Sequence, residues 1–125
     1  MSRDHSDETD VIRTRLGHML EAVELIDRFL GDRTADDIRE DLQTLHAIRS
    51  AFMQLGEAAN RVPESYRRAH RDIPWDEIRK YRNFIVHAYD LIMVDPLWET
   101  AANHVPKLRE PLARLLADVS QEGDD

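Results

Sequence analysis

Hydrophobic residues recur at every third or fourth position along most of the chain, the spacing expected of amphipathic α-helices. The first such stretch covers about residues 7–30, and Gly31 supplies a stop signal directly after it. A second stretch covers about residues 34–62, where Thr34 can cap the first turn and Pro63 ends the helix. The pattern therefore predicts two long helices that pack as antiparallel partners.

The second half of the chain predicts shorter elements separated by prolines. Residues 63–70 suit a short helical turn, and Pro74 is well placed in the first turn of a further helix. A final helix is expected over residues 95–119. Pro106 and Pro111 lie inside it, and each removes a backbone donor, so we expect a kink near one of them.

Composition supports an all-α chain with a single domain. The sequence has 125 residues, of which 42% are hydrophobic, and only four are glycine and five proline. We expect one up-and-down helical bundle of four to five helices over residues 1–125, with flexible tails at about 1–6 and 120–125. The chain has no cysteine, its first ten residues are polar, and no stretch approaches the roughly 20 apolar residues of a membrane span. A cytoplasmic protein without membrane contact is the expectation.

The charge is distributed unevenly. The formal net charge is −8, which disfavours non-specific binding of nucleic acid. Between Arg61 and Arg82, however, seven basic residues stand against four acidic ones, a local charge of +3 that leaves −11 on the rest of the chain. This basic stretch is compatible either with a confined nucleic-acid or nucleotide site or with a solvated helix face.

A polar motif follows the basic stretch. Arg82, Asn83, His87 and Tyr89 offer a phosphate ligand, a polar neighbour, a proton carrier and a phenol, a set suited to metal-free cleavage of a phosphodiester. On one straight helix Arg82 and Tyr89 would share an apolar arc, whereas His87 would lie about 140° away from Arg82. A shared site would therefore need a distorted helix or a second copy of the helix in a symmetric homodimer.

Several motifs in a fixed order resemble the HepT-like family of the HEPN superfamily, over about residues 48–116. They are Gly56-Glu57-Ala58, Ile73-Pro74-Trp75 with Ile78, Arg82-Asn83 followed by His87 and Tyr89, and Trp98. The segment between Tyr89 and Asp95 departs from the Phe-Gly type that is usual in the family, which puts the substrate choice and the recognition of the tyrosine in question.

The resemblance implies a dimeric, metal-independent endoribonuclease that is the toxin of a toxin–antitoxin pair, acting on RNA without a cofactor. Arg82 and His87 match the catalytic pair of the family, and Asn83 is a supporting residue. Tyr89 matches the position that a cognate minimal nucleotidyltransferase antitoxin adenylylates. No histidine spacing suggests a metal site.

Two other interpretations remain open. The chain could be a non-catalytic helical partner of a nucleotidyltransferase that binds nucleotide or substrate through Arg82. It could also be a structural dimerisation domain in which Arg82 is buried and paired.

Overall fold

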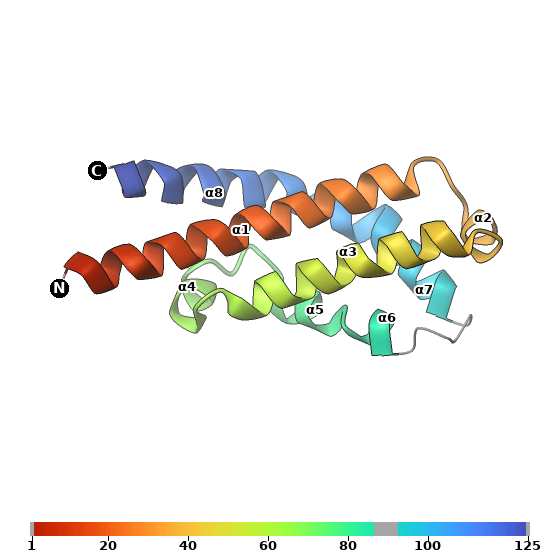
Figure 1. Ribbon diagram of the computed structural model, residues 1–125, viewed down its shortest axis with the longest axis horizontal. Helices are drawn as coiled ribbons and strands as arrows, with labels where there is room; N and C mark the ends of the chain where they lie inside the picture. The colour runs from red at the N-terminus through yellow and green to blue at the C-terminus, as the bar shows by residue number, and fades with distance from the viewer. Residues whose placement is uncertain (1, 87–92, 125) are drawn as a thin grey trace.

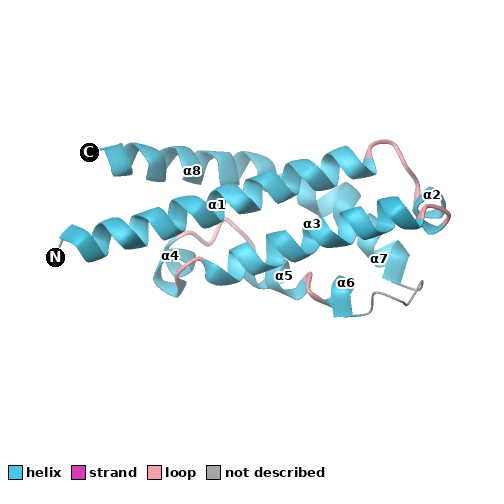
Figure 2. Cartoon of the chain, viewed as in Figure 1, coloured by secondary structure: helices cyan, strands magenta, loops and turns pink. Residues whose placement is uncertain are grey.

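The computed structural model describes residues 2–86 and 93–124, and every regular element in these ranges is a helix, which confirms the all-α class (Figures 1 and 2). The α-helices are α1 (Ser2–Leu30), α2 (Ala35–Arg39), α3 (Leu42–Arg61), α4 (Glu64–Ala69), α5 (Trp75–Lys80), α6 (Asn83–Val86), α7 (Val94–Glu99) and α8 (Arg109–Asp124). A π-helical turn, η2 (Thr100–His104), and a 3₁₀ turn, η3 (Val105–Leu108), connect α7 to α8. These helices outnumber the predicted four to five because the long predicted helices are interrupted.

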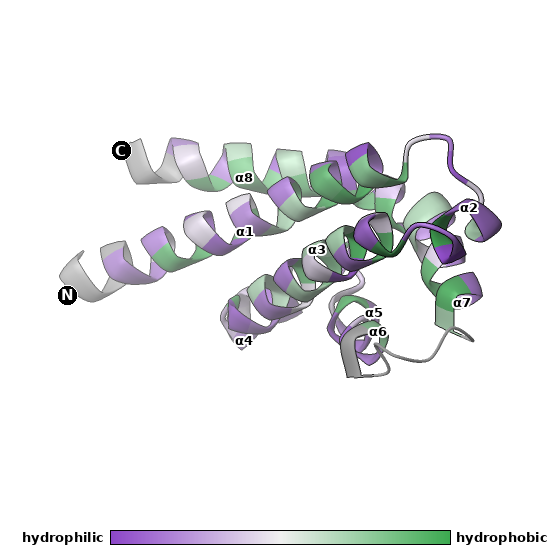
Figure 3. Cartoon of the chain, turned by 45° about the vertical axis from the view of Figure 1, so that its right-hand side comes forward, coloured by the Kyte–Doolittle hydropathy of each residue, from purple (hydrophilic) through white to green (hydrophobic). Residues whose placement is uncertain are grey.

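The central helix of the bundle is α1, which lies between α3 and α8 and runs antiparallel to both (Figure 1). Figure 3 shows hydrophobic stretches on the sides of these helices that face one another. Many of the core side chains are fully buried, and burial of each leucine or isoleucine contributes about 2 kcal/mol. Fully buried residues include Leu16, Met19, Val23, Ile26, Leu45, Ile48, Phe52, Leu55 and Leu112.

The short helices α4, α5 and α6 follow α3 in the chain, and α5 and α6 pack against it (Figure 1). As predicted, α3 ends at Arg61, just before Pro63, and a short helix follows. Trp75 begins α5 as a buried residue, and its indole Nε1 donates a hydrogen bond to the carbonyl of His70 at 2.8 Å. This contact fixes the α4–α5 connection against the core.

The predicted single helix over residues 34–62 is wrong, because the chain breaks between α2 and α3. Its start is confirmed: the Thr34 hydroxyl accepts from the Asp37 amide at 3.1 Å, and the Asp37 carboxylate accepts from the Thr34 amide at 2.9 Å. Asp41 causes the break by capping α3, since its carboxylate accepts from the hydroxyl of Thr44 at 2.7 Å and from its amide at 3.1 Å. These hydrogen bonds also lower the pKa of Asp41.

The predicted kink in the last helix is confirmed and lies at Pro106. A proline clashes with the carbonyl four residues before it, and the backbone avoids the clash by widening into η2, where the Val105 amide donates to the carbonyl of Thr100. The chain then tightens through η3 before α8 begins. Pro111 is tolerated, because it falls in the first turn of α8, where backbone amides lack helical partners.

The outer helices extend further than predicted. Residues 2–6 continue α1 and residues 120–124 continue α8, where the composition predicts tails. A helix that is already formed adds each further residue at little cost, and Leu115 and Val119 anchor α8 by being buried. Within the described ranges, none of the helices combines the length and the apolar character that crossing a bilayer requires.

Candidate functional site

The structure places two of the four predicted site residues. Arg82 and Asn83 lie at the junction between α5 and α6, and both side chains are exposed. His87 and Tyr89 lie outside the described residues. Their predicted roles therefore stay predictions, and the site is described from Arg82 and the residues around it.

The motif does not lie on one straight helix, because the helix is interrupted at Tyr81–Arg82. The Tyr81 amide donates to the carbonyl of Ile78 at 3.0 Å, and the Phe84 amide donates to the carbonyl of Tyr81 at 3.1 Å. These three-residue turns place side chains at positions i and i+3 on the same side of the backbone. Both aromatic rings then pack on Phe52, with ring centroids 5.3 Å away for Tyr81 and 5.1 Å away for Phe84.

The interruption changes the surroundings of Arg82. On a continuous helix it would lie within an apolar arc, but here Tyr81 occupies the buried position with 9% of its surface exposed, and Arg82 faces solvent. The sequence left two ways to bring Arg82 and His87 together, a distorted helix or a second copy of the helix in a homodimer. The structure has a distorted helix at Arg82. Burial, and secondarily the carboxylate of Glu77, raises the pKa of Tyr81 to about 12, so its phenol is neutral at physiological pH.

Gly56 on α3 lies where the backbone and side chain of a neighbouring segment approach closely. A Cβ atom at this position would lie 3.6 Å from the carbonyl oxygen of Ile78 and 3.7 Å from Cγ of Arg82. The aliphatic stem of Arg82 therefore crosses α3 at the glycine. Beside it lies an open pocket of about 220 Å³, lined by Gly56, Glu57, Asn60, Arg61 and Arg82.

Asn60 is a polar lining residue that the sequence analysis missed. It is exposed and shares the pocket with Arg82, and the same asparagine lines the next hollow along the surface. The sequence feature that indicates Asn60 as a site residue is its spacing of four residues from Gly56, because this spacing puts both residues on one face of α3.

Arg49 was also missed, although it is a buried charged residue of α3 with only 5% of its surface exposed. Burial lowers its pKa, and its Nε and Nη2 atoms have no hydrogen-bond partner among the described residues. Arg49 precedes Phe52 by three residues and Gly56 by seven, so the three share the face of α3 that meets the α5–α6 junction.

Trp98, the last residue of the motif set, joins two parts of the bundle. Its ring is half-buried on α7, and its Nε1 donates to the carbonyl of Arg33 at 2.8 Å. Nearby, Arg39 of α2 pairs with Asp95 of α7. Within residues 2–86 and 93–124, no three histidine, aspartate or glutamate side chains come close enough together to hold a metal ion.

The chain is similar to a known protein family over most of its length. Residues 19–115 match the family described as Ribonuclease HepT-like. A "Probable ribonuclease HepT" of Thermococcus cleftensis is 32% identical over 92% of this chain and 98% of its own length. A "Putative RNase" of Caldanaerobacter subterraneus subsp. tengcongensis is 30% identical over 83% of this chain and 93% of its own length.

No solved structure gives a significant match to the chain. The family match nevertheless covers more than half of the sequence, and the first of these relatives aligns along nearly its entire length. The matched region includes α3, the α5–α6 junction and Arg82. This chain therefore belongs to the Ribonuclease HepT-like family.

Proposed function

We propose that this chain is a metal-independent endoribonuclease and the toxin of a toxin–antitoxin pair. Its family and the ribonuclease names of its relatives support RNA as the substrate. The observation that carries the proposal is the exposed Arg82 beside the Gly56 pocket, at the point where the helix is interrupted. A guanidinium that faces solvent next to a hollow can bind a phosphate through two parallel hydrogen bonds.

The reaction that fits this set of residues uses the RNA as its own nucleophile. The 2′-hydroxyl attacks the adjacent phosphorus, a bond forms between the 2′-oxygen and phosphorus, and the bond to the 5′-oxygen breaks. His87 accepts the 2′ proton and returns a proton to the leaving 5′-oxygen, so the products carry a 2′,3′-cyclic phosphate and a 5′-hydroxyl. Arg82 stabilises the negative charge on the non-bridging oxygens, and Asn83 assists as the adjacent exposed polar residue.

A symmetric homodimer completes this site in our proposal. Pairing of two α5–α6 junctions brings Arg82 and His87 from both copies to one cleft, because a twofold interface applies the same patch of surface twice. The interrupted helix supports this arrangement, since the turn at Tyr81–Arg82 leaves the arginine exposed and free to face a partner.

Tyr89 serves as the control point of this enzyme. A minimal nucleotidyltransferase antitoxin transfers adenylyl groups from ATP to its phenol: the phenol oxygen loses its proton and bonds to the α-phosphorus, and the bond to the β-phosphate breaks and releases pyrophosphate. The modification adds bulk and negative phosphate charge next to the catalytic pair. Both effects exclude an RNA phosphate from Arg82. Protein co-expressed with the nucleotidyltransferase is expected to gain mass in adenylyl units, and Tyr89→Phe is expected to stay unmodified and active. An inhibited protein of unchanged mass would contradict this mode of control.

Cleavage of RNA by the unmodified protein in EDTA tests the enzymatic activity. We expect 2′,3′-cyclic phosphate ends, and a loss of about 10²–10⁴-fold in kcat for His87→Ala. His46→Ala is the matched control, because this exposed histidine lies on α3 outside the pocket, and it is expected to leave the rate unchanged. Absence of cleavage by the wild type, or full activity of His87→Ala, would refute the proposal.

A further inference from the structure

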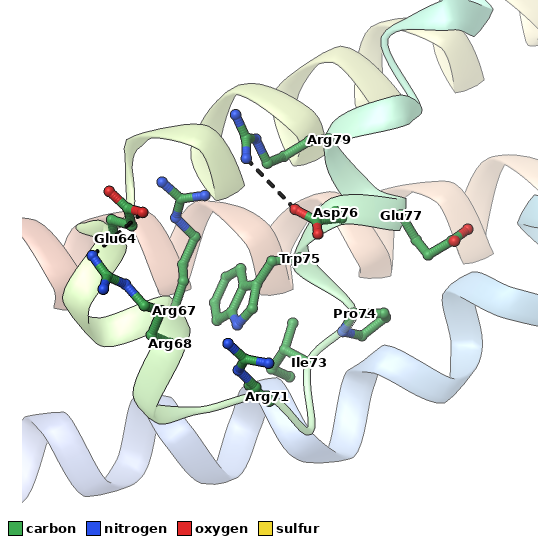
Figure 4. A pocket seen from close by; sticks show the side chains of 10 residues that line it. All are labelled: Glu64, Arg67, Arg68, Arg71, Ile73, Pro74, Trp75, Asp76, Glu77 and Arg79. Carbon is green, nitrogen blue, oxygen red and sulfur yellow. Dashed lines mark ion pairs between the residues drawn. The ribbon is translucent and has the colours of Figure 1, made fainter.

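Two adjoining hollows extend from the Arg82 pocket across the surface of α4 and α5. The nearer has a volume of about 350 Å³ and is lined by Asn60, Asp76, Arg79, Lys80 and Arg82. The farther is about 450 Å³ and is lined by Glu64, Arg67, Arg68, Arg71, Ile73, Pro74, Trp75, Asp76, Glu77 and Arg79 (Figure 4). The two hollows share Asp76 and Arg79, and together they form one continuous groove, called here the α4–α5 groove. The nearer hollow also shares Asn60 and Arg82 with the Arg82 pocket, so the groove opens into that pocket.

The α4–α5 groove is basic on an acidic protein. Six arginine or lysine residues line it against three acidic residues, whereas the whole chain has a net charge of −8. Two of the arginines form ion pairs along their own helices: Arg68 lies 3.4 Å from Glu64, and Arg79 lies 3.6 Å from Asp76. Both pairs are exposed, so water weakens them and leaves the guanidinium groups available to a stronger anion.

The walls of the groove are held in place by contacts with the backbone. Nε of Arg67 donates to the carbonyl of Val62 at 3.0 Å, and the buried Trp75 is fixed by its bond to His70. Figure 4 shows Arg67 and Arg71 beside the Trp75 ring, Arg68 turned toward Glu64, and Arg79 on the far side of the hollow. Arg71, Lys80 and Arg82 are exposed and enter no ion pair within the described part of the chain.

We infer that the α4–α5 groove binds the phosphate backbone of the RNA nucleotides that flank the cleaved bond. This inference rests on the proposed function and adds to it a path for the substrate. A row of guanidinium groups is suited to successive phosphates, and the groove leads directly to Arg82, where the scissile phosphate binds. The acidic remainder of the protein repels a polyanion and thereby confines it to this path.

The test compares two double variants that remove the same charge. Arg71→Gln/Arg79→Gln removes two exposed arginines of the groove, of which Arg79 is paired with Asp76 on its own helix and Arg71 is not in an ion pair with a described residue. Arg28→Gln/Arg114→Gln is the matched control on α1 and α8, since Arg28 is exposed and Arg114 is exposed and lies 3.5 Å from Glu110. Binding to single-stranded RNA is measured by fluorescence anisotropy over a range of salt, in full-length protein carrying His87→Ala to prevent cleavage.

The groove variant is expected to bind RNA about tenfold more weakly, and its slope of log affinity against log salt should be smaller by about 1.4, because each lost phosphate contact removes about 0.7. The control should keep both the affinity and the slope. Circular dichroism checks that both variants are folded. Equal weakening of the two variants, or an unchanged slope in the groove variant, would overturn the inference.

Other outcomes separate this inference from the proposed function. If the wild type cleaves no RNA while the groove variant alone loses RNA affinity, the groove stands and the ribonuclease proposal fails. If the wild type cleaves RNA and the groove variant binds RNA as tightly as the wild type, the ribonuclease proposal stands and the inference about the groove fails. Loss of affinity for the nucleotidyltransferase with unchanged RNA binding would assign the groove to a protein partner and refute the inference.

Discussion

Replacing Gly56 by alanine tests the packing of α3 against the site most directly. A glycine inside a helix costs about 1 kcal/mol relative to alanine. The new Cβ would lie 3.6 Å from the carbonyl oxygen of Ile78 and 3.7 Å from Cγ of Arg82, which are ordinary van der Waals distances. Gly56→Ala is therefore expected to raise the free energy of unfolding by about 1 kcal/mol and the Tm by about 4 °C, measured by urea and thermal denaturation.

Gly17→Ala is the matched control for this prediction. Gly17 lies within α1, and a Cβ there would meet no atom within 4 Å, so the substitution reports helix propensity alone. Both alanine variants should stabilise the protein by similar amounts. If Gly17→Ala stabilises while Gly56→Ala lowers the free energy of unfolding by 1 kcal/mol or more, on the order of an overpacking penalty, the contact at Gly56 is tighter than described and the reasoning is refuted.

A larger side chain at the same position should affect the site itself. Gly56→Leu adds three carbon atoms beyond Cβ, at a point where Cγ of Arg82 is already in contact. We expect an overpacking cost of about 1–3 kcal/mol and displacement of Arg82 from its pocket. RNA cleavage should fall by more than the loss of folded protein explains, whereas Gly56→Ala should stay active.

Two further predictions concern buried groups near the site. Arg49→Met should raise the free energy of unfolding by about 1 kcal/mol, because it removes a desolvated guanidinium whose two nitrogens have no hydrogen-bond partner among the described residues. Urea denaturation measures this change, and a decrease of about 3 kcal/mol in the free energy of unfolding would instead show that the guanidinium is paired. The raised pKa of Tyr81 makes the phenol a source of stability that is fully present below pH 10 and is lost as the pH rises towards 12. Tyr81→Phe should abolish this alkaline loss, which is on the order of 2 kcal/mol, and equal alkaline sensitivity of both proteins would contradict the assignment.

The helix ends with a strong local signal were predictable from the sequence. Thr34 and Asp37 form the expected cap, Gly31 has the positive φ of 52° that a helix stop favours, and α3 ends ahead of Pro63. The distortion at Pro106 was also predictable from local sequence, because the ring and the missing amide hydrogen of a proline disrupt a helix interior without help from distant residues. Each of these signals depends on residues a few positions apart.

The helix breaks that depend on distant or competing contacts were not predictable in the same way. At Asp41 the apolar spacing continues unbroken, but the carboxylate caps Thr44 and begins a new helix. At Tyr81–Arg82 the turn is tightened by two rings that pack on Phe52, about thirty residues earlier in the sequence. Periodicity along one segment contains no information about a ring contributed by another helix.

The break at Tyr81–Arg82 also separates two interpretations of the arginine. An arginine buried within an apolar arc would have to be paired, and its loss would destabilise the protein by about 3–5 kcal/mol. Arg82 is instead exposed, so Arg82→Gln should change the free energy of unfolding by less than about 0.5 kcal/mol while greatly reducing RNA cleavage. Urea denaturation and a cleavage assay on the same preparation measure both quantities. If the wild type has no cleavage activity and Arg82→Gln loses both stability and dimerisation, the chain would instead be a structural dimerisation domain.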